Sequence, residues 1–219
     1  MNLLPLPDIS EALVLLKEVL VVTLTAQMTS DRSEGILPNI KGGAIKMELF
    51  QQAGSLKARG AYLGIQQISE REKLKGVVAA SGGNHALAVA WAAKKAGVSA
   101  KIAMPKATDE MRINGCHALG AEVILCRDIA DAFSKMETCA SDEGRTIMHP
   151  FEGRHMTLGS ATCGAEFVTA HPEIDLFIIP VGGGGLISGM ATAIKLIRPE
   201  AIVIGVEPYG ADSMFQSLK

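Results

Sequence analysis

Apolar positions along this chain fall into two patterns that alternate from one end to the other. Short unbroken apolar runs, such as residues 77–80 and 176–181, predict strands buried in a sheet. Apolar residues three or four positions apart, as over residues 84–96, predict helices. This alternation is typical of an α/β fold with a mainly parallel sheet. The expected strands are residues 44–48, 77–80, 101–104, 122–125, 146–148, 176–181 and 201–206, and the expected helices are 57–67, 84–96, 109–119, 129–142, 158–169 and 186–197.

Polar stretches that are rich in glycine and proline separate these elements. Residues 29–43 and 152–157 are therefore expected loops. Asp8 is expected to cap a first helix with an apolar face. Residues 77–148 form a unit that is self-contained enough to be a small domain, with residues 70–75 as its hinge.

The composition narrows the function classes. The chain has 219 residues and is 48% hydrophobic, which excludes a disordered protein and allows a sizeable core. Its formal net charge is −2 and it has no basic stripe, so we expect no nucleic-acid partner. The densest apolar stretch, residues 12–26, is interrupted by Lys17 and Glu18 and is too short to span a bilayer, so we expect no membrane partner. The N-terminus carries Asp8 and no early positive charge, unlike a signal peptide.

The cysteines suggest no special chemistry. Cys116, Cys126, Cys139 and Cys163 form no C-x-x-C pair and have no metal-binding spacing. We expect reduced core thiols in a cytoplasmic protein.

Four consecutive glycines, Gly182, Gly183, Gly184 and Gly185, stand between an expected strand and an expected helix. Backbone N–H groups at such a turn point outward, no Cβ blocks a ligand, and the helix dipole favours negative charge. This pattern predicts a phosphate site. The alternative is a tight turn whose glycines serve packing only.

A lysine follows another break in the chain. Gly54 precedes Ser55, which is expected to cap the next helix and to place Lys57 in its first turn. The positive end of the helix dipole there lowers the pKa of a lysine, which suits an amine that forms a Schiff base. Taken alone, Lys57 is more simply a solvated surface lysine.

A second glycine-rich turn has polar groups at the start of a helix. Ser81, Asn84 and the backbone N–H groups of Gly82, Gly83 and His85 could hold a carboxylate or a ring hydroxyl. The alternative is an ordinary loop in which Asn84 caps the helix and His85 is packed.

Small polar residues also open the expected helix at residues 158–169. Ser160 and Thr162 could cap that helix or touch a ligand, and capping is the simpler interpretation of this segment alone.

Together these stretches resemble one family, the fold-type II pyridoxal-phosphate enzymes, in the branch of the threonine/serine dehydratases and serine racemases. The matches occur in family order and cover most of the chain. They are K-M-E-L-F-Q-Q-A-G-S-L-K-A-R-G-A at 46–61, S-G-G-N-H-A at 81–86, M-P-K-A at 104–107, A-L-G-A-E-V at 118–123, H-P-F-E at 149–152 and V-G-G-G-G-L-I-S-G at 181–189.

The resemblance implies a fold like that of the tryptophan synthase β subunit, with two open parallel-sheet αβα domains. Residues 1–68 would begin the large domain, residues 76–149 would form the small domain, and residues 150–219 would continue the large domain. The chain stops before the family's usual end, so the large domain would be incomplete at its C-terminus.

The resemblance also implies roles for individual residues. Lys57 would be the Schiff-base lysine and the catalytic base, and Asn84 would hydrogen-bond the ring hydroxyl of pyridoxal 5'-phosphate. The cofactor phosphate would be held by Gly182, Gly183, Gly184, Gly185 and Leu186. The amino-acid substrate would be bound by Ser55, Ser81, Gly82, Gly83, His85 and Ser160.

The implied reaction is β-elimination from a hydroxy amino acid such as L-threonine or L-serine, which gives a 2-oxo acid and ammonia. Racemase-like activity is an alternative, but the racemase pattern has a serine where this chain has Gly82, and glycine cannot carry a proton. Where the family usually reads G-Q-G-T, residues 159–162 read G-S-A-T, which leaves substrate recognition open.

A family cation site for Mg²⁺ or Ca²⁺ would use Glu207, the carbonyl of Ala211 and, by position, Ser213, beside Asp212. A capped surface turn explains the same residues.

Two other functions stay open from the sequence. The short chain could be an impaired homologue or a fragment that needs a partner chain, and an exposed sheet edge would favour a homo-oligomer such as a dimer. A nucleotide-dependent dehydrogenase is the remote alternative, because Gly183-x-Gly185-x-x-Ser188 approximates the dinucleotide fingerprint and Glu207 ends the next strand.

Overall fold

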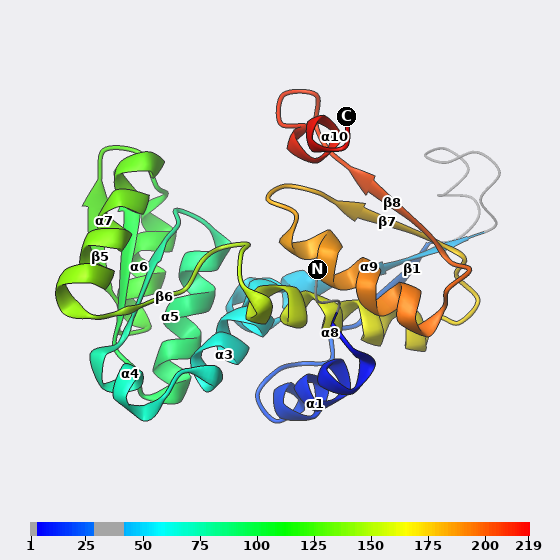
Figure 1. The fold of residues 1–219 in the computed structure, drawn as a ribbon, viewed down its shortest axis with the longest axis horizontal. Coiled ribbons are helices and arrows are strands. Elements are labelled where there is room, and N and C mark those ends of the chain that lie inside the picture. Colours follow the sequence, from blue (N-terminus) through cyan, green and yellow to red (C-terminus); the bar gives the residue numbers. More distant parts are fainter. Residues whose placement is uncertain (1–3, 29–41) are drawn as a thin grey trace.

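The computed structural model describes residues 4–28 and 42–219 (Figure 1). It contains a four-stranded sheet and two two-stranded sheets, with helices packed on them. Residues 29–41 of the loop expected at 29–43 lie outside the described residues, and Gly43 begins a strand.

The four-stranded sheet is parallel throughout and has the order β5-β4-β3-β6. One of its two inner strands, β3 (Val77–Ala80), is buried along its whole length because both faces of the sheet are covered. Val77 and Ala79 face one core, and Val78 and Ala80 face the other, as the two-residue period of a strand requires. The other strands are β4 (Ala100–Pro105), β5 (Glu122–Cys126) and β6 (Thr146–Ile147).

Helices cover both faces of this sheet. α5 (Asn84–Ala96) and α6 (Glu110–Ala118) share a core with Ile102 and Met104, whereas α7 (Ile129–Glu143) packs on the opposite face through Met136. The small side chains of α5 fit closely against the sheet, and seven of its residues are buried.

The last part of the chain is a second strand–helix–strand unit. β7 (Leu176–Pro180) and β8 (Ile202–Val206) pair in parallel, and α9 (Gly185–Ile197) connects them. Phe177 and Ile194 lie in the core that α9 shares with β7. On the other face of the pair, apolar side chains are half-exposed, namely Ile178, Ile202, Ile204 and Val206.

A group of helices joins these two parts, as Figure 1 shows. α3 (Lys57–Gln67) packs against both α5 and α8 (Arg154–Ala170), and α8 packs along α9. α1 (Leu6–Lys17) covers α3 and α8. The remaining elements are the antiparallel pair β1 (Thr25–Met28) and β2 (Gly43–Lys46), the 3-10 turns η1 (Glu48–Phe50) and η2 (Gln52–Gly54), α4 (Glu70–Lys75) and α10 (Ser213–Ser217).

The α/β fold class is confirmed, and most expected elements are present. Residues 57–67 and 84–96 form helices over the expected range. The pair β1–β2 departs from the mainly parallel pattern, and β1 was not expected as a strand. Residues 70–75, the expected hinge, form α4, because Ser69 and Glu72 form a capping box at its start, and the role as a hinge remains a prediction.

Three capping predictions are wrong. α1 begins at Leu6 with Pro5 as its N-cap, and Asp8 instead forms an ion pair with Arg154. No side chain caps α3, whose N-cap is Leu56 rather than Ser55. α8 begins four residues before residue 158, so Ser160 and Thr162, expected near a helix start, lie inside it.

The described cysteines are free and buried, in agreement with the expected core thiols. Among the described helices, none is long and apolar enough to cross a membrane.

Candidate active site

A cavity of about 400 Å³ brings the two glycine-rich turns and the lysine together. One wall is the turn between β3 and α5, and another is the turn between β7 and α9, so both walls lie at the carboxyl ends of parallel strands, where α/β proteins bind ligands. Its lining residues are Leu56, Lys57, Ser81, Asn84, His85, Pro150, Phe151, Pro180, Val181, Gly182, Gly183, Gly184, Gly185 and Leu186.

Lys57 is the first residue of α3 and its amine is partly buried in this cavity. The amine donates a hydrogen bond to the carbonyl of Pro150 at 2.5 Å. Burial lowers the pKa of the Lys57 amine. The direction is the one expected from the sequence, and the cause is the loss of water around the amine.

The turn between β3 and α5 presents polar groups to the cavity. Asn84 is exposed as the first residue of α5, and the helix N-cap is Gly83, so the alternative in which Asn84 caps the helix is wrong. The Ser81 hydroxyl accepts a hydrogen bond from the N–H of Gly83 at 3.0 Å. That N–H group is therefore already used within the turn.

His85 is buried and lies beside this turn. Its Nε2 is 2.8 Å from the carbonyl of Met148, and because a carbonyl only accepts, Nε2 carries the hydrogen. Burial lowers the pKa of the His85 imidazole to about 3, so the ring is neutral. Its other nitrogen, Nδ1, is buried without a hydrogen-bond partner among the described residues.

The turn between β7 and α9 has the features of an anion cradle. A Cβ on Gly182 would have nothing within 4 Å, and Gly184 has a φ of 82°, which favours glycine. α9 begins at Gly185, and no described side chain caps it. The N–H groups of its first turn are therefore available to a ligand, and their dipole favours a phosphate.

Phe151 fixes one side of this cradle. A Cβ on Gly183 would lie 2.5 Å from the Phe151 ring, and a Cβ on Gly185 would lie 2.7 Å from the Phe151 carbonyl. The ring also packs edge-on against His149, with centroids 4.6 Å apart. Glycines at 183 and 185 are therefore needed for packing against Phe151, and the phosphate site expected at this turn remains a prediction.

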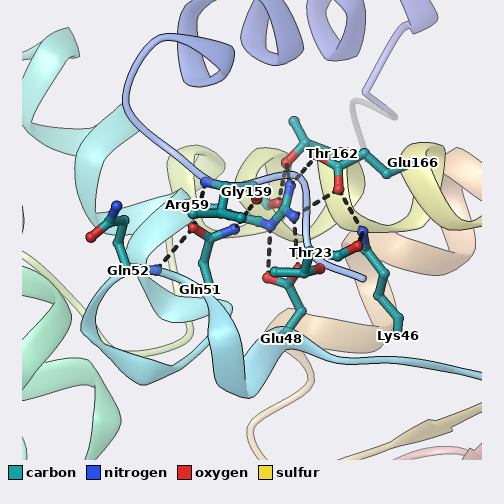
Figure 2. A network of polar contacts seen from close by, with 10 residues as sticks. Thr23, Lys46, Glu48, Gln51, Gln52, Arg59, Gly159, Thr162 and Glu166 are labelled. Carbon is teal, nitrogen blue, oxygen red and sulfur yellow. Dashed lines mark hydrogen bonds and ion pairs between the residues drawn. The ribbon is translucent and has the colours of Figure 1, made fainter. Parts of the chain in front are cut away.

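A network of buried and partly buried charges surrounds Arg59, as Figure 2 shows. Arg59 is 1% exposed and pairs with Glu48 and Glu166 at 2.8 and 2.7 Å. Burial opposes its charge, but the hydrogen bonds to the two carboxylates outweigh burial and raise the pKa of the guanidinium. Lys46 completes the network by pairing with Glu166 at 2.9 Å.

Some predicted site residues do not line the cavity. Ser160 is 2% exposed and its hydroxyl donates to the carbonyl of Met156 at 3.0 Å. Ser55 is buried, and its hydroxyl has no partner among the described residues. Gly82 and Gly83 border the cavity-lining Ser81, and their predicted contacts with substrate remain predictions.

The residues predicted for a cation site lie between the end of β8 and the first residue of α10. Both carboxylate oxygens of Glu207 accept backbone N–H groups, from Met214 at 2.8 Å and from Phe215 at 2.9 Å. In the part of the chain that the structure describes, no cluster of three or more His, Cys, Asp or Glu residues could hold a metal. The cation site with Ala211 and Ser213 therefore remains a prediction.

Sequence reasoning missed several cavity residues. Pro150 and Phe151 belong to the H-P-F-E segment, which matched the family but had no role assigned. Leu56, Pro180 and Val181 flank the predicted residues and supply apolar walls. Nothing in the sequence shows that Glu166 meets Arg59, because they lie 107 residues apart.

Comparison with known proteins gives consistent matches. Residues 37–219 match the family described as "Pyridoxal-phosphate dependent enzyme". A phenylserine dehydratase from Ralstonia pickettii is 42% identical over 174 residues, which is 80% of this chain and 53% of that protein. An L-threonine ammonia-lyase from Thermotoga maritima is 41% identical over 220 residues, which is 99% of this chain and 53% of that protein. The chain thus spans about half the length of these curated relatives.

Solved structures are also similar to this chain over nearly its whole length. Maize serine racemase has a TM-score of 0.90 and 33% identity, and the match covers 99% of this chain and 66% of that one. Threonine deaminase isoform 2 from Solanum lycopersicum has a TM-score of 0.88 and 34% identity, and the match covers 98% of this chain and 63% of that one.

Proposed function

Since this chain belongs to the pyridoxal-phosphate-dependent enzyme family, we propose that it carries the active site of a lyase acting on a hydroxy amino acid. The products would be a 2-oxo acid and ammonia, and the substrate would be L-threonine, L-serine or a related amino acid. One observation carries the proposal. The Lys57 amine, the Ser81–Asn84 turn and the glycine turn before α9 line the same cavity. The names of the relatives support the reaction class.

The cavity suits pyridoxal 5'-phosphate. The open turn at Gly182–Gly185 and the uncapped start of α9 would hold its phosphate, with Leu186 beside them. Lys57 would attach covalently to the cofactor, and the Asn84 amide would contact its ring. When bound, the cofactor supplies a carbonyl that reacts with amines and a ring that stabilises negative charge on the substrate α-carbon.

The residues of this chain would supply binding and proton transfer. The hydroxyl of Ser81 and the backbone N–H groups of Gly82 and His85 would orient the substrate carboxylate. Lys57 would take the α-proton, because burial lowers its pKa and keeps more of the amine unprotonated at neutral pH. Apolar walls from Leu56 and Val181 would exclude water from the amine.

The wider organisation is part of the same proposal. Residues 76–149 would form the small domain, and residues 1–68 and 150–219 would belong to the large domain. The separate four-stranded sheet with its own helices supports this division. The half-exposed apolar face of β7 and β8 supports a homodimer, which light scattering of the purified protein would test. Buried free thiols support a reducing compartment such as the cytoplasm.

Two alternatives from the sequence analysis, the dehydrogenase and the racemase, are less well supported than the lyase. The dehydrogenase alternative is wrong, because the family match covers the glycine turn on which it depended. Racemisation needs a second proton carrier, and Gly82 has no side chain. A Cβ there would lie 2.6 Å from the Thr108 hydroxyl, so this position also lacks room for one unless Thr108 moves.

The test combines cofactor trapping with product analysis. Purified protein loaded with pyridoxal 5'-phosphate should be yellow, and borohydride should fix the pyridoxyl group on Lys57, as peptide mapping would show. Lys57→Arg should lose the trapped group, whereas the exposed Lys106→Arg should keep it. L-threonine or L-serine should then yield a 2-oxo acid. A yellow protein that forms no 2-oxo acid would favour the impaired homologue or a need for a partner chain, and formation of D-serine would favour the racemase.

A further inference from the structure

Arg59 lies two residues after Lys57 on α3, and its guanidinium uses all five of its N–H donors. Nε donates to Glu48 at 2.8 Å, and one terminal nitrogen donates to Glu48 and Glu166, each at 2.8 Å. The other terminal nitrogen donates to Glu166 at 2.7 Å and to the Thr162 hydroxyl at 3.2 Å. Only a planar fork with this number of donors can satisfy both carboxylates at once.

The charges of the network balance. Lys46 donates to Glu166 and to the carbonyl of Thr23, each at 2.9 Å, and the Thr23 hydroxyl donates to Glu48 at 2.7 Å. Two cations therefore face two carboxylates. Ion pairs that are largely removed from water are often no more stabilising than packed apolar side chains, so stability alone is a weak reason for the network. The network does hold the segments that carry these four side chains in one relative arrangement.

That geometry fixes α3 against α8. The helices meet where Gly159 faces Gly60, and a Cβ on Gly159 would lie 2.6 Å from the Gly60 Cα. This close approach lets the Arg59 fork reach Glu166 on α8. The Thr162 hydroxyl, which accepts from Arg59, donates in turn to the Gly159 carbonyl at 2.7 Å.

The segment before Lys57 is also held in place, by hydrogen bonds between Gln51 and the backbone of Val21. The Gln51 side chain accepts from the N–H of Val21 at 3.0 Å and donates to the Val21 carbonyl at 2.7 Å. Ala53 has a φ of 55°, the left-handed region that residues with a Cβ seldom adopt. The first turn of α3 thus has a strained loop before it and the Arg59 network behind it.

Resting on the proposed role of Lys57, we propose that Arg59 is the positioning residue that holds the start of α3 so that the Lys57 amine stays in the cavity. Lys57 occupies the first position of α3, so no earlier turn of that α-helix restrains it. Its amine is aligned with the Pro150 carbonyl only while that turn keeps its place against η1 and α8. Arg59 joins η1, through Glu48, to α8, through Glu166.

The test uses Arg59→Lys, which keeps the charge but loses the fork. Two quantities are measured at a temperature where each protein is folded, namely the dissociation constant for pyridoxal 5'-phosphate and the pH midpoint for its attachment to Lys57, trapped with borohydride. We expect the dissociation constant to rise about tenfold or more, since small displacements of a reactive group have large effects. We expect the pH midpoint to rise by about one unit as the amine gains water. Thr162→Val removes one of the five hydrogen bonds and should have a smaller effect in the same direction.

Arg145→Lys is the matched control, because Arg145 pairs with Glu143 at 2.8 Å and is not among the cavity residues. It should leave both quantities within about twofold of the wild type. If Arg59→Lys lowers only the melting temperature and both quantities stay within twofold, Arg59 is merely structural and the proposal fails. If Arg59→Lys does not fold, Glu166→Gln is measured in its place, and the proposal fails if both quantities stay within twofold of the wild type. None of these measurements needs turnover, so a protein that binds the cofactor but forms no 2-oxo acid would favour the impaired homologue or a need for a partner chain and leave this test intact. Wild-type protein without a trapped group on Lys57 overturns both proposals.

Discussion

The amine of Lys57 lies 2.5 Å from the carbonyl oxygen of Pro150, a residue 93 positions later in the chain. The next residue, Phe151, packs on Gly183, and Met148 just before accepts from His85. The segment 148–151 therefore contacts Lys57, the glycine turn before α9 and, through His85, the start of α5. This connection explains why residues without reactive groups, such as Pro150 and Phe151, belong to the candidate site.

The glycine turn offers a pair of neighbouring substitutions with different expected results. Gly183→Ala places a Cβ 2.5 Å from the Phe151 ring, so the ring or the turn must move, and we expect a loss of about 1–3 kcal/mol in the free energy of unfolding. Gly182→Ala, with nothing within 4 Å, should change it by no more than about 0.5 kcal/mol. Denaturant unfolding without cofactor measures both, and equal losses would contradict the packing role of Phe151.

The crossing of α3 and α8 should not tolerate a methyl group. In Gly159→Ala the added Cβ lies 2.6 Å from the Gly60 Cα, and because backbone cannot yield as a side chain does, we expect a loss of about 3 kcal/mol or an unfolded protein. Gly210→Ala, which meets nothing within 4 Å, is the control. Thermal unfolding followed by circular dichroism measures the difference, and a melting temperature for Gly159→Ala equal to that of the control would show that the helices can separate.

Ala53, which precedes Lys57 and has a left-handed backbone conformation, should tolerate substitution by glycine. For Ala53→Gly, relief of the left-handed conformation offsets the greater backbone entropy of glycine, so the free energy of unfolding should stay within about 0.5 kcal/mol of the wild type. In the exposed first turn of α7, Ala130→Gly has no such relief and should cost about 0.5–1 kcal/mol. Urea unfolding of both variants checks this, and a larger loss for Ala53→Gly would argue against strain at that position.

His85 should make stability depend on pH. Its pKa is about 3 in the folded protein, against an ordinary value of 6.5, because burial opposes the charged ring, with Lys57, His149 and His155 acting in the same direction. Between these two values the unfolded chain binds a proton that the folded chain does not. The free energy of unfolding therefore falls as pH falls from 6.5, by up to about 1.4 kcal/mol per pH unit.

His85→Gln keeps a donor for the Met148 carbonyl and removes the titration. Its free energy of unfolding should fall less steeply than that of the wild type between pH 7 and pH 5, the range over which urea unfolding compares them. His117→Gln, at an exposed position near the end of α6, is the control and should keep the wild-type slope. Parallel wild-type and His85→Gln curves would mean that the ring is not buried as neutral imidazole.

Local pattern was enough to predict much of this protein. The apolar runs gave β3 and β7, and the helical spacing gave α3 and α5, because burial on two faces or on one stripe leaves a period in the sequence. The glycine turns and Lys57 could also be identified as candidate chemistry, since backbone access and a helix start are properties of neighbouring residues.

The distant contacts could not be predicted in this way. That Lys57 meets Pro150, that Arg59 meets Glu166 and that Phe151 covers Gly183 depend on how α3, α8 and α9 pack. Packing also places Ser160 outside the cavity lining, and it buries the Lys57 amine, which lowers the pKa of that amine. A periodic pattern records which face of an element is buried, but it does not record what lies opposite that face.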